Sequence, residues 1–245
     1  YRGVDIAELV DKPFLQVAWL ILFGAWPDEQ EEQQLAQFMN YQGQLTPREI
    51  RLMHQVSRKL HPMLMLQGIL PLLDLPDNSS LGLDQSAEHG LALAAKIPSL
   101  IAAHYRLGLD KEPISGSADK SLHENFLTMF NGTPPTADQI RILDAAQILQ
   151  MEHSFNAGTF AGRVCASTLA PIQSVISASV GTLFGKLHGG ADQAALEMAI
   201  AIGDASRAQA YVEDALANKV KIMGMGHREY RTVDPRARIL KPMAI

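Results

Sequence analysis

Apolar side chains recur at intervals of three and four residues through most of this 245-residue chain. That period is typical of helices with one buried face. The clearest segments are 30–39, 47–60, 86–107, 136–150 and 191–202. No alternating run is long enough to predict a strand, and the segments differ too much to be repeats. The pattern therefore predicts an all-α protein.

Two of these segments carry an explicit start signal. Thr46 is followed three residues later by Glu49, and Thr136 is followed three residues later by Gln139. This spacing predicts capping boxes, in which the two side chains satisfy each other's free backbone N–H groups. We expect helices to begin directly after both threonines.

Two apolar stretches raise the question of membrane insertion. Residues 14–26 are apolar but fall short of the roughly 20 residues that a spanning helix needs. Residues 164–185 carry no charge, yet they include Pro171, Gln173 and four serines, so they are weakly hydrophobic for a span. We expect a buried or interfacial helix pair there, and no membrane partner.

Composition narrows the range of protein classes to which the chain can belong. With 47% hydrophobic and 19% charged residues the chain is not disordered, and a net charge of −5 offers no basic excess for nucleic acid. The single cysteine, Cys165, cannot form an internal disulfide, which favours a reducing, cytoplasmic location. The chain begins at Tyr1 without a leader, so we expect a piece of a longer product.

Three of the eight histidines are candidates for chemistry. The other five lie within or beside helical patterns, where packing or surface roles are expected: His54, His61, His89, His104 and His123. His153 follows the end of an apolar helix, among small and polar residues that would hold an imidazole toward a cavity. His188 and His227 lie in glycine-flanked loops, where a neutral imidazole N–H would stabilise an enolate or alkoxide.

Arginines follow the last of these loops. Arg236 suits bidentate binding of a carboxylate, and Arg228 suits a carboxylate or a phosphate. The run Asp234-Pro235-Arg236 also fits a plain helix start, with Asp as cap and Pro in the first position. Both interpretations can hold together.

Other sites are disfavoured. No histidine pair has zinc-ligand spacing on one helix, so no metal is expected. Gly224 and Gly226 lack the third glycine and the preceding strand of a dinucleotide fingerprint. Gly185-Lys186 lacks the surrounding residues of a phosphate loop.

Taken in order, the motifs resemble those of the citrate synthase family, in the bacterial branch that includes 2-methylcitrate synthases. The matching segments are Tyr1-Arg2-Gly3, Glu152-His153-Ser154-Phe155-Asn156-Ala157, Leu187-His188-Gly189-Gly190, Gly226-His227-Arg228 and Asp234-Pro235-Arg236. Each is weak alone, but together they are specific. The resemblance implies a large helical domain, here residues 1–187, and the start of a smaller helical domain, here residues 188–245.

The resemblance also implies an activity. Such enzymes condense acetyl-CoA, a co-substrate, with oxaloacetate to give citrate and free CoA in the tricarboxylic acid cycle, without a metal or a permanently bound cofactor. It implies that His188 hydrogen-bonds the thioester carbonyl and that His227 polarises the oxaloacetate ketone. His153, Asn156 and Arg236 would bind oxaloacetate. The stretch Met223, Gly224, Met225 and Gly226 would lie near CoA.

Several features depart from the family pattern. The family's catalytic aspartate lies in a segment well after Asp-Pro-Arg, and the chain stops at Ile245, before it; Asp234 belongs to another motif. Gly158 stands where the family often has a serine. Two alternatives therefore remain open: a 2-methylcitrate synthase using propionyl-CoA, and a non-catalytic helical paralogue. In either case the family resemblance and the small residues of 171–184 predict a homodimer.

Overall fold

The computed structural model describes residues 1–77, 80–226 and 230–243. Within these ranges all regular structure is helical and no strand occurs, which confirms the predicted all-α class. The α-helices are α1 (Ile6–Leu9), α2 (Phe14–Phe23), α3 (Glu29–Gln42), α4 (Pro47–Gln55), α5 (Pro62–Ile69), α6 (Gln85–Gly108), α7 (Leu122–Asn131), α8 (Ala137–Gln150), α9 (Ala157–Ala166), α10 (Ile172–Leu183), α11 (Gly190–Ile202), α12 (Ala208–Ala217) and α13 (Pro235–Met243), with short 3₁₀ turns η1 (Leu70–Leu72) and η2 (Ala205–Arg207).

Both predicted capping boxes are present. At α4, Glu49 N donates to Thr46 Oγ1 at 3.2 Å and Thr46 N donates to Glu49 Oε2 at 2.9 Å. Thr136 and Gln139 make the same two bonds at the start of α8. These residues therefore set where α4 and α8 begin.

The predicted helix 47–60 is too long. α4 ends at Gln55, because Val56 is extended and the next residues form a turn closed by Leu60 N and Ser57 O. Pro62 then starts α5, and a residue before proline is driven out of the helical region. The apolar periodicity continues across this break, which is why the pattern alone misses it.

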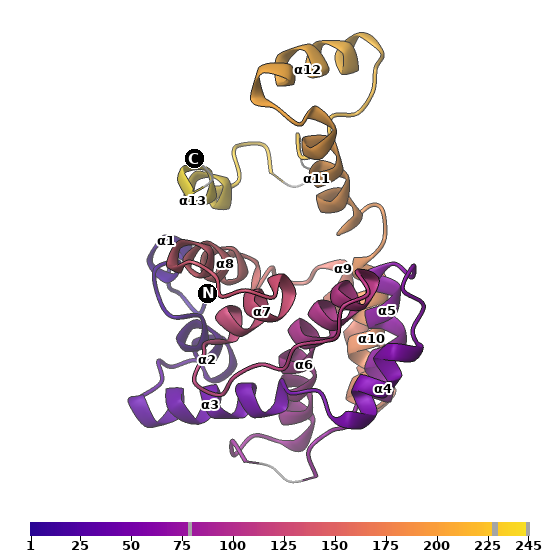
Figure 1. The fold of residues 1–245 in the computed structure, drawn as a ribbon. Helices are drawn as coiled ribbons and strands as arrows, with labels where there is room; N and C mark the ends of the chain where they lie inside the picture. The colour runs from indigo at the N-terminus through magenta and orange to yellow at the C-terminus, as the bar shows by residue number, and fades with distance from the viewer. Residues whose placement is uncertain (78–79, 227–229, 244–245) are drawn as a thin grey trace.

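Helix α6 is the central element of the fold (Figure 1). One of its faces packs with α4, α5, η1 and α10 around the buried side chains of Leu66, Leu93 and Leu100. Another packs on α3 through Ala92 and Ala95. Buried apolar area of this kind is the main favourable term in folding.

A charged pair is buried where α4 meets α6. Lys96 Nζ lies 2.8 Å from both carboxylate oxygens of Glu49, and the two side chains are 4% and 0% exposed. Glu49 also accepts hydrogen bonds from the backbone of Thr46 and of Asp74. The buried charges are thus paired and hydrogen-bonded, as a low-dielectric interior requires.

A helix pair is present at residues 164–185, as expected, but this stretch holds only the last three residues of α9 together with all of α10, and the first helix begins earlier, at Ala157. These two helices lie side by side, and α10 also contacts α5, η1 and α6. No helix in the described ranges combines the length and the apolar character needed to cross a bilayer.

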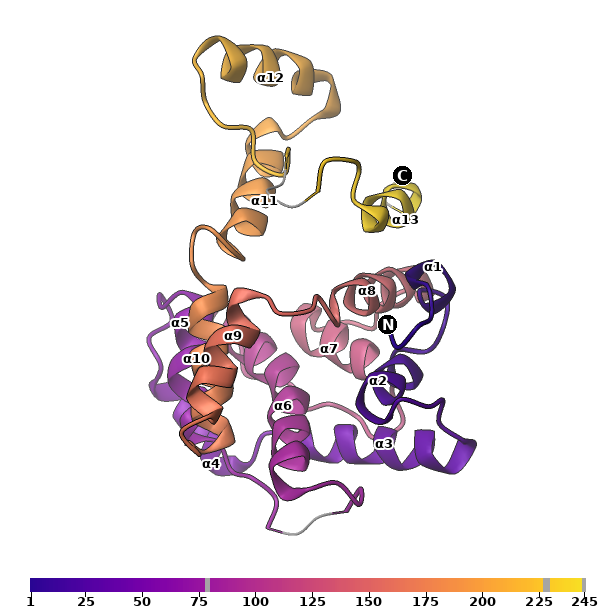
Figure 2. The ribbon, with the colours of Figure 1, turned by 180° about the vertical axis from the view of Figure 1, so that it is seen from behind.

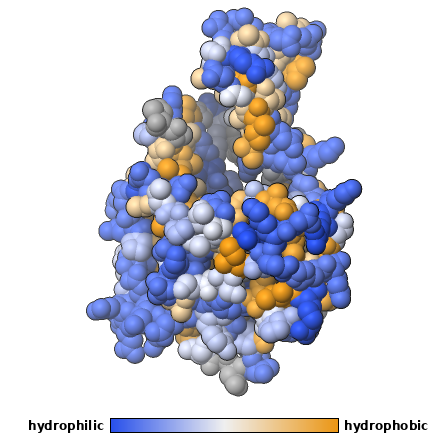
Figure 3. All heavy atoms as spheres, in the orientation of Figure 1, coloured by the Kyte–Doolittle hydropathy of each residue, from blue (hydrophilic) through white to orange (hydrophobic). Residues whose placement is uncertain are grey.

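The last helices are arranged differently from the rest. Figures 1 and 2 show α11 and α12 standing away from the body formed by α1–α10, whereas α13 returns to it. Ile239, Leu240 and Met243 of α13 pack against α1 and α8. Leu196 and Ile200 of α11 and Leu216 of α12 are exposed. Hydrophobic surface is visible on this part of the molecule in Figure 3. The division at residue 187 stays a prediction.

Candidate functional site

His153 lies in the connection between α8 and α9. The segment is irregular: Ser154 has a positive φ of 53°, and its N–H is hydrogen-bonded to the carboxylate of Glu152. Asn156 then caps α9, because its Oδ1 accepts from Thr159 N at 3.0 Å. His153 is thereby presented, exposed, at the end of α8, while the side-chain oxygen of Asn156 is engaged in capping.

Arg236 projects from the first turn of α13 and is held by Asp234. Arg236 Nε lies 3.0 and 3.2 Å from the two carboxylate oxygens, and Nη2 lies 2.6 Å from Oδ2. Asp234 Oδ1 also accepts from Arg236 N at 2.9 Å, while Pro235 opens the helix. The helix-start interpretation of this run is confirmed, and Asp234 also binds the guanidinium; binding of a ligand carboxylate by Arg236 stays a prediction.

This pair shifts the ionisation of both groups. The hydrogen bonds from Arg236 hold the pKa of Asp234 below the ordinary carboxyl range, and the charge of His153 acts in the same direction. The hydrogen bonds to Asp234 raise the pKa of Arg236. One edge of the guanidinium, Nε and Nη2, is occupied by Asp234. Among the described residues no hydrogen bond is made at Nη1, and the edge formed by Nη1 and Nη2 has the geometry to bind a carboxylate.

Two tyrosines complete what we call the Arg236 cluster: Tyr1, His153, Tyr230, Asp234 and Arg236. The rings of His153 and Tyr230 lie 6.4 Å apart, and Tyr1 and Tyr230 both act electrostatically on Arg236. Tyr1 Oη donates to Ile148 O at 2.7 Å, and burial raises the pKa of this phenol. The structure thus brings together two predicted site residues, His153 and Arg236.

Sequence reasoning missed the tyrosines and the partner role of Asp234. Tyr1 lies in a motif that the resemblance had marked, so its presence was a usable signal. Tyr230 carried no signal. Asp234 was seen only as a cap, although a carboxylate two residues before an arginine is placed to bind it.

His188 lies in a different segment, the loop between α10 and α11. His188 N donates to Gly185 O at 2.8 Å and Gly189 N donates to Leu183 O at 2.9 Å. A Cβ on Gly189 would lie 2.7 Å from Leu183 O, closer than real Cβ atoms approach. This glycine is therefore needed for a tight backbone turn, and the turn leaves the half-buried His188 in the loop.

The remaining predicted site residues lie near the end of the chain. Met223, Gly224, Met225 and Gly226 precede His227, which lies outside the described residues together with Arg228 and Glu229. Gly224 and Gly226 have φ of 78° and 82°, a conformation that favours glycine. A Cβ on Gly224 would lie 3.7 Å from Ala195 of α11, so this stretch runs beside that helix. A role in CoA binding stays a prediction.

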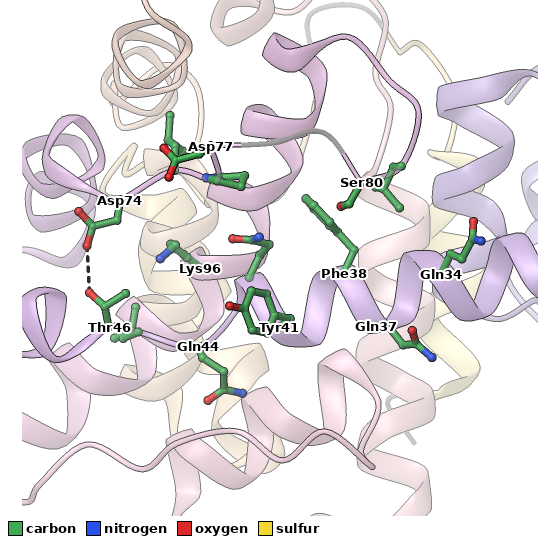
Figure 4. A pocket seen from close by; sticks show the side chains of 15 residues that line it. Gln34, Gln37, Phe38, Tyr41, Gln44, Thr46, Asp74, Asp77, Ser80 and Lys96 are labelled. Carbon is green, nitrogen blue, oxygen red and sulfur yellow. Dashed lines mark hydrogen bonds between the residues drawn. The ribbon is translucent and has the colours of Figure 1, made fainter.

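A separate pocket of about 790 Å³ lies between α3 and residues 74–77 and 80–81 (Figure 4). Its lining includes amide side chains of α3, among them Gln34 and Gln37, and none of the predicted site residues. Lys96 borders it, but its charge is matched by Glu49. Thr46 Oγ1 donates to Asp74 at its edge. The pocket is thus distinct from the Arg236 cluster.

Comparison with known proteins gives a consistent result along the whole chain. The family described as "Citrate synthase, C-terminal domain" matches residues 1–245. Citrate synthase 2 of Bacillus subtilis is 36% identical over 250 residues, covering 100% of this chain and 67% of that protein. The 2-methylcitrate synthase of Shewanella oneidensis is 35% identical, covering 98% and 64%.

Solved structures agree. Citrate synthase from Thermotoga maritima superposes with a TM-score of 0.85 at 34% identity, covering 99% of this chain and 64% of that one. A Thermoplasma acidophilum citrate synthase, solved as a ternary complex with carboxymethyl coenzyme A and oxaloacetate, gives a TM-score of 0.86 at 26% identity, covering 99% of this chain and 65% of that one. The chain thus spans about two thirds of the length of these relatives.

Proposed function

This chain belongs to the citrate synthase family, and from that premise we propose that the protein condenses acetyl-CoA with oxaloacetate to give citrate and free CoA. The Arg236 cluster is the observation that carries the proposal. It joins an imidazole to a guanidinium whose second edge makes no hydrogen bond within the described part of the chain, from segments far apart in sequence. That combination suits a small dicarboxylate with a keto group.

The proposed roles follow from the chemistry of carbon–carbon bond formation. His188 would donate a hydrogen bond to the thioester carbonyl while a carboxylate base, the family's catalytic aspartate outside residues 1–245, takes a proton from the methyl group. The hydrogen bond stabilises the enol-like nucleophile that forms. His227 would polarise the ketone, and Arg236, His153 and Asn156 would bind oxaloacetate. Water then hydrolyses the citryl thioester. Closure of the second helical unit over the substrates, with a boundary near residue 188, would exclude water during condensation.

Membership of the family is also the basis on which we propose the pathway, the location and the oligomeric state. We place the reaction in the tricarboxylic acid cycle of the cytoplasm, with acetyl-CoA as co-substrate and no permanently bound cofactor. The protein would act as a homodimer. The solved relative with carboxymethyl coenzyme A and oxaloacetate supports these two ligand classes.

Release of free thiol on mixing the full-length protein with acetyl-CoA and oxaloacetate tests the proposal. We expect steady thiol release that depends on both substrates and falls at least a hundredfold in His188→Ala. A matched control is His54→Gln, which removes an exposed imidazole paired with Glu112 and should leave the rate unchanged. Silence with both thioesters at high enzyme concentration would favour the non-catalytic alternative.

The second candidate, 2-methylcitrate synthase, is favoured by relatives of that name at nearly the same identity. The two activities differ by space for one methylene, worth about 1–3 kcal/mol. The ratio of kcat/KM for propionyl-CoA to that for acetyl-CoA decides between them. A ratio well above one would replace citrate by 2-methylcitrate as the product.

A further inference from the structure

His61 occupies a junction between the helical body and the loop that carries His188. It immediately precedes α5, and its Nδ1 accepts a hydrogen bond from Met63 N at 3.2 Å. Since Nδ1 is an acceptor, the proton of the neutral ring sits on Nε2. The imidazole thus caps α5 with one nitrogen and has a donor on the other.

That donor reaches α11. His61 Nε2 lies 3.1 Å from Gln193 Oε1, in the first turn of α11. The amide of Gln193 is oriented by its other end, because its Nε2 donates to Glu197 Oε1 at 2.8 Å. Both side chains are therefore oriented for a single hydrogen bond, which His61 Nε2 donates to Gln193 Oε1.

The face of the same ring rests on the end of α10. The ring centroids of His61 and Phe184 lie 4.5 Å apart, with planes inclined by 32°. Phe184 is the C-terminal cap of α10, and the loop to α11 begins directly after it. One side chain thereby contacts the residue before the loop and a residue just after it.

His188 lies between these two contacts, four residues after Phe184 and five before Gln193. Within the loop, backbone hydrogen bonds such as Gly189 N to Leu183 O fix the local turn. They do not tie the start of α11 to α5. The His61 ring does so, through Gln193.

We infer that His61 is a positioning residue for the reaction, which fixes the His188 loop by clamping both of its ends. The inference rests on the role proposed for His188. Reacting groups must be held within fractions of an ångström, and a displacement of about 1 Å can cost a hundredfold in rate. Loosening the clamp should therefore lower kcat without removing any group that binds oxaloacetate.

His61→Asn separates this role from the cap of α5. Asparagine is among the best N-caps, so α5 and the thermal midpoint should be retained, but its side chain is too short for Gln193 and has no ring. We expect kcat to fall about tenfold, with KM for oxaloacetate changed less than twofold. Gln193→Met removes the acceptor at similar length, and we expect a smaller fall in the same direction.

The matched control is Gln209→Met on α12. Gln209 donates to Glu213 four residues on, as Gln193 does to Glu197, but it is not bonded to His61. We expect no change in kcat. The double variant His61→Asn/Gln193→Met should be no slower than His61→Asn alone, because both changes break one contact.

Hydrogen–deuterium exchange of the peptide 184–193 in the same full-length variants gives a readout that does not require activity. Faster exchange in His61→Asn and Gln193→Met, but not in Gln209→Met, would support the clamp even if the proposed reaction proved wrong. Unchanged exchange in both clamp variants would overturn the inference. So would kcat within twofold of the wild type in an active enzyme, or a parallel rise in KM that accounts for the whole effect.

Discussion

At the scale of single residues, the Arg236 guanidinium is bound by Asp234 and is proposed to bind a ligand carboxylate as well. Asp234 takes one of its edges through Nε and Nη2 and fixes its direction. Hydrogen bonds between charged groups are worth about 1.5–3 kcal/mol. Asp234→Asn keeps one acceptor oxygen but loses the charge and the second acceptor. We therefore expect KM for oxaloacetate to rise about tenfold, with a smaller change in kcat, in steady-state assays.

The control for this variant is Asp138→Asn, at the exposed pair that Asp138 makes with Arg141 at 3.5 Å. It should leave both constants unchanged. An unchanged KM in Asp234→Asn would show that Arg236 is held by other groups.

The same aspartate predicts a pH dependence of stability. Because Arg236 lowers the pKa of Asp234 in the folded protein, the pair contributes stability above the ordinary carboxyl pKa of about 3.9. That contribution is lost as the pH falls through the lower, folded-state pKa. Urea unfolding at neutral pH should find Asp234→Asn less stable than the wild type, and the difference should shrink toward zero in acid. A difference that stayed constant with pH would contradict this linkage.

Gly189 gives a test of the loop backbone. Gly189→Ala would place a Cβ 2.7 Å from the carbonyl oxygen of Leu183, and backbone cannot move aside as a flexible side chain can. We expect the loop to shift, with thiol release reduced at least tenfold while the helical circular dichroism spectrum is retained. Gly68→Ala is the control: nothing lies within 4 Å of a Cβ there, and alanine in a helix should stabilise by up to about 1 kcal/mol.

At the scale of elements, the buried pair of Glu49 and Lys96 joins α4 to α6. Lys96→Met leaves a fully buried carboxylate without its cation, and breaking such a pair typically costs about 3–5 kcal/mol. We expect a loss of this size in the free energy of unfolding, measured with urea. Much of it should return in Glu49→Gln/Lys96→Met, where no unpaired charge remains.

An exposed pair provides the comparison. Lys120 and Glu124 lie four residues apart at the start of α7, with Nζ and Oε1 at 3.1 Å. Lys120→Met should cost less than about 1 kcal/mol. Equal losses in the two lysine variants would mean that burial does not set the energy of the Glu49 pair.

The helices also show which structural features could be predicted from sequence patterns. The starts of α4 and α8 could be predicted because a capping box is contained within four residues. The end of α4 could not, since the apolar period runs on past Gln55 while Pro62 imposes a new start. The pair of Lys96 with Glu49 was also out of reach, because 47 positions separate its partners. Features set by neighbouring residues could thus be predicted from the sequence, and contacts between distant residues could not.

At the scale of the whole molecule, consecutive helices at the end of the chain do not all lie in the same part of the structure. α11 and α12 stand away from the body, yet α13 returns to α1 and α8 (Figure 2). The Asp234–Arg236 pair at its start thereby comes within electrostatic reach of His153. Motifs could indicate that these residues act together, as the resemblance implied. They could not indicate Tyr230, which lies in no marked motif and whose place in the cluster depends on where the end of the chain docks.

The proposed homodimer requires a surface that a second copy of the chain can cover. α10 is packed among α5, α6 and α9, and only its last residue, Leu183, is exposed. α9, however, exposes Phe160 and Val164, which lie four residues apart and are 56% and 53% exposed. Two such apolar residues on adjacent turns form a surface that a second copy could cover, because residues four apart share one face of a helix.

Light scattering of the full-length protein at micromolar concentration should give the mass of a dimer, and Val164→Asp should shift it toward the monomer. A carboxylate in the middle of such an interface would be desolvated without a partner, which costs several kilocalories per mole. Tyr41→Glu, at a 78% exposed position on α3, should leave the mass unchanged. A wild-type monomer would contradict the homodimer itself. A Val164→Asp dimer as stable as the wild type would place its interface elsewhere than on α9.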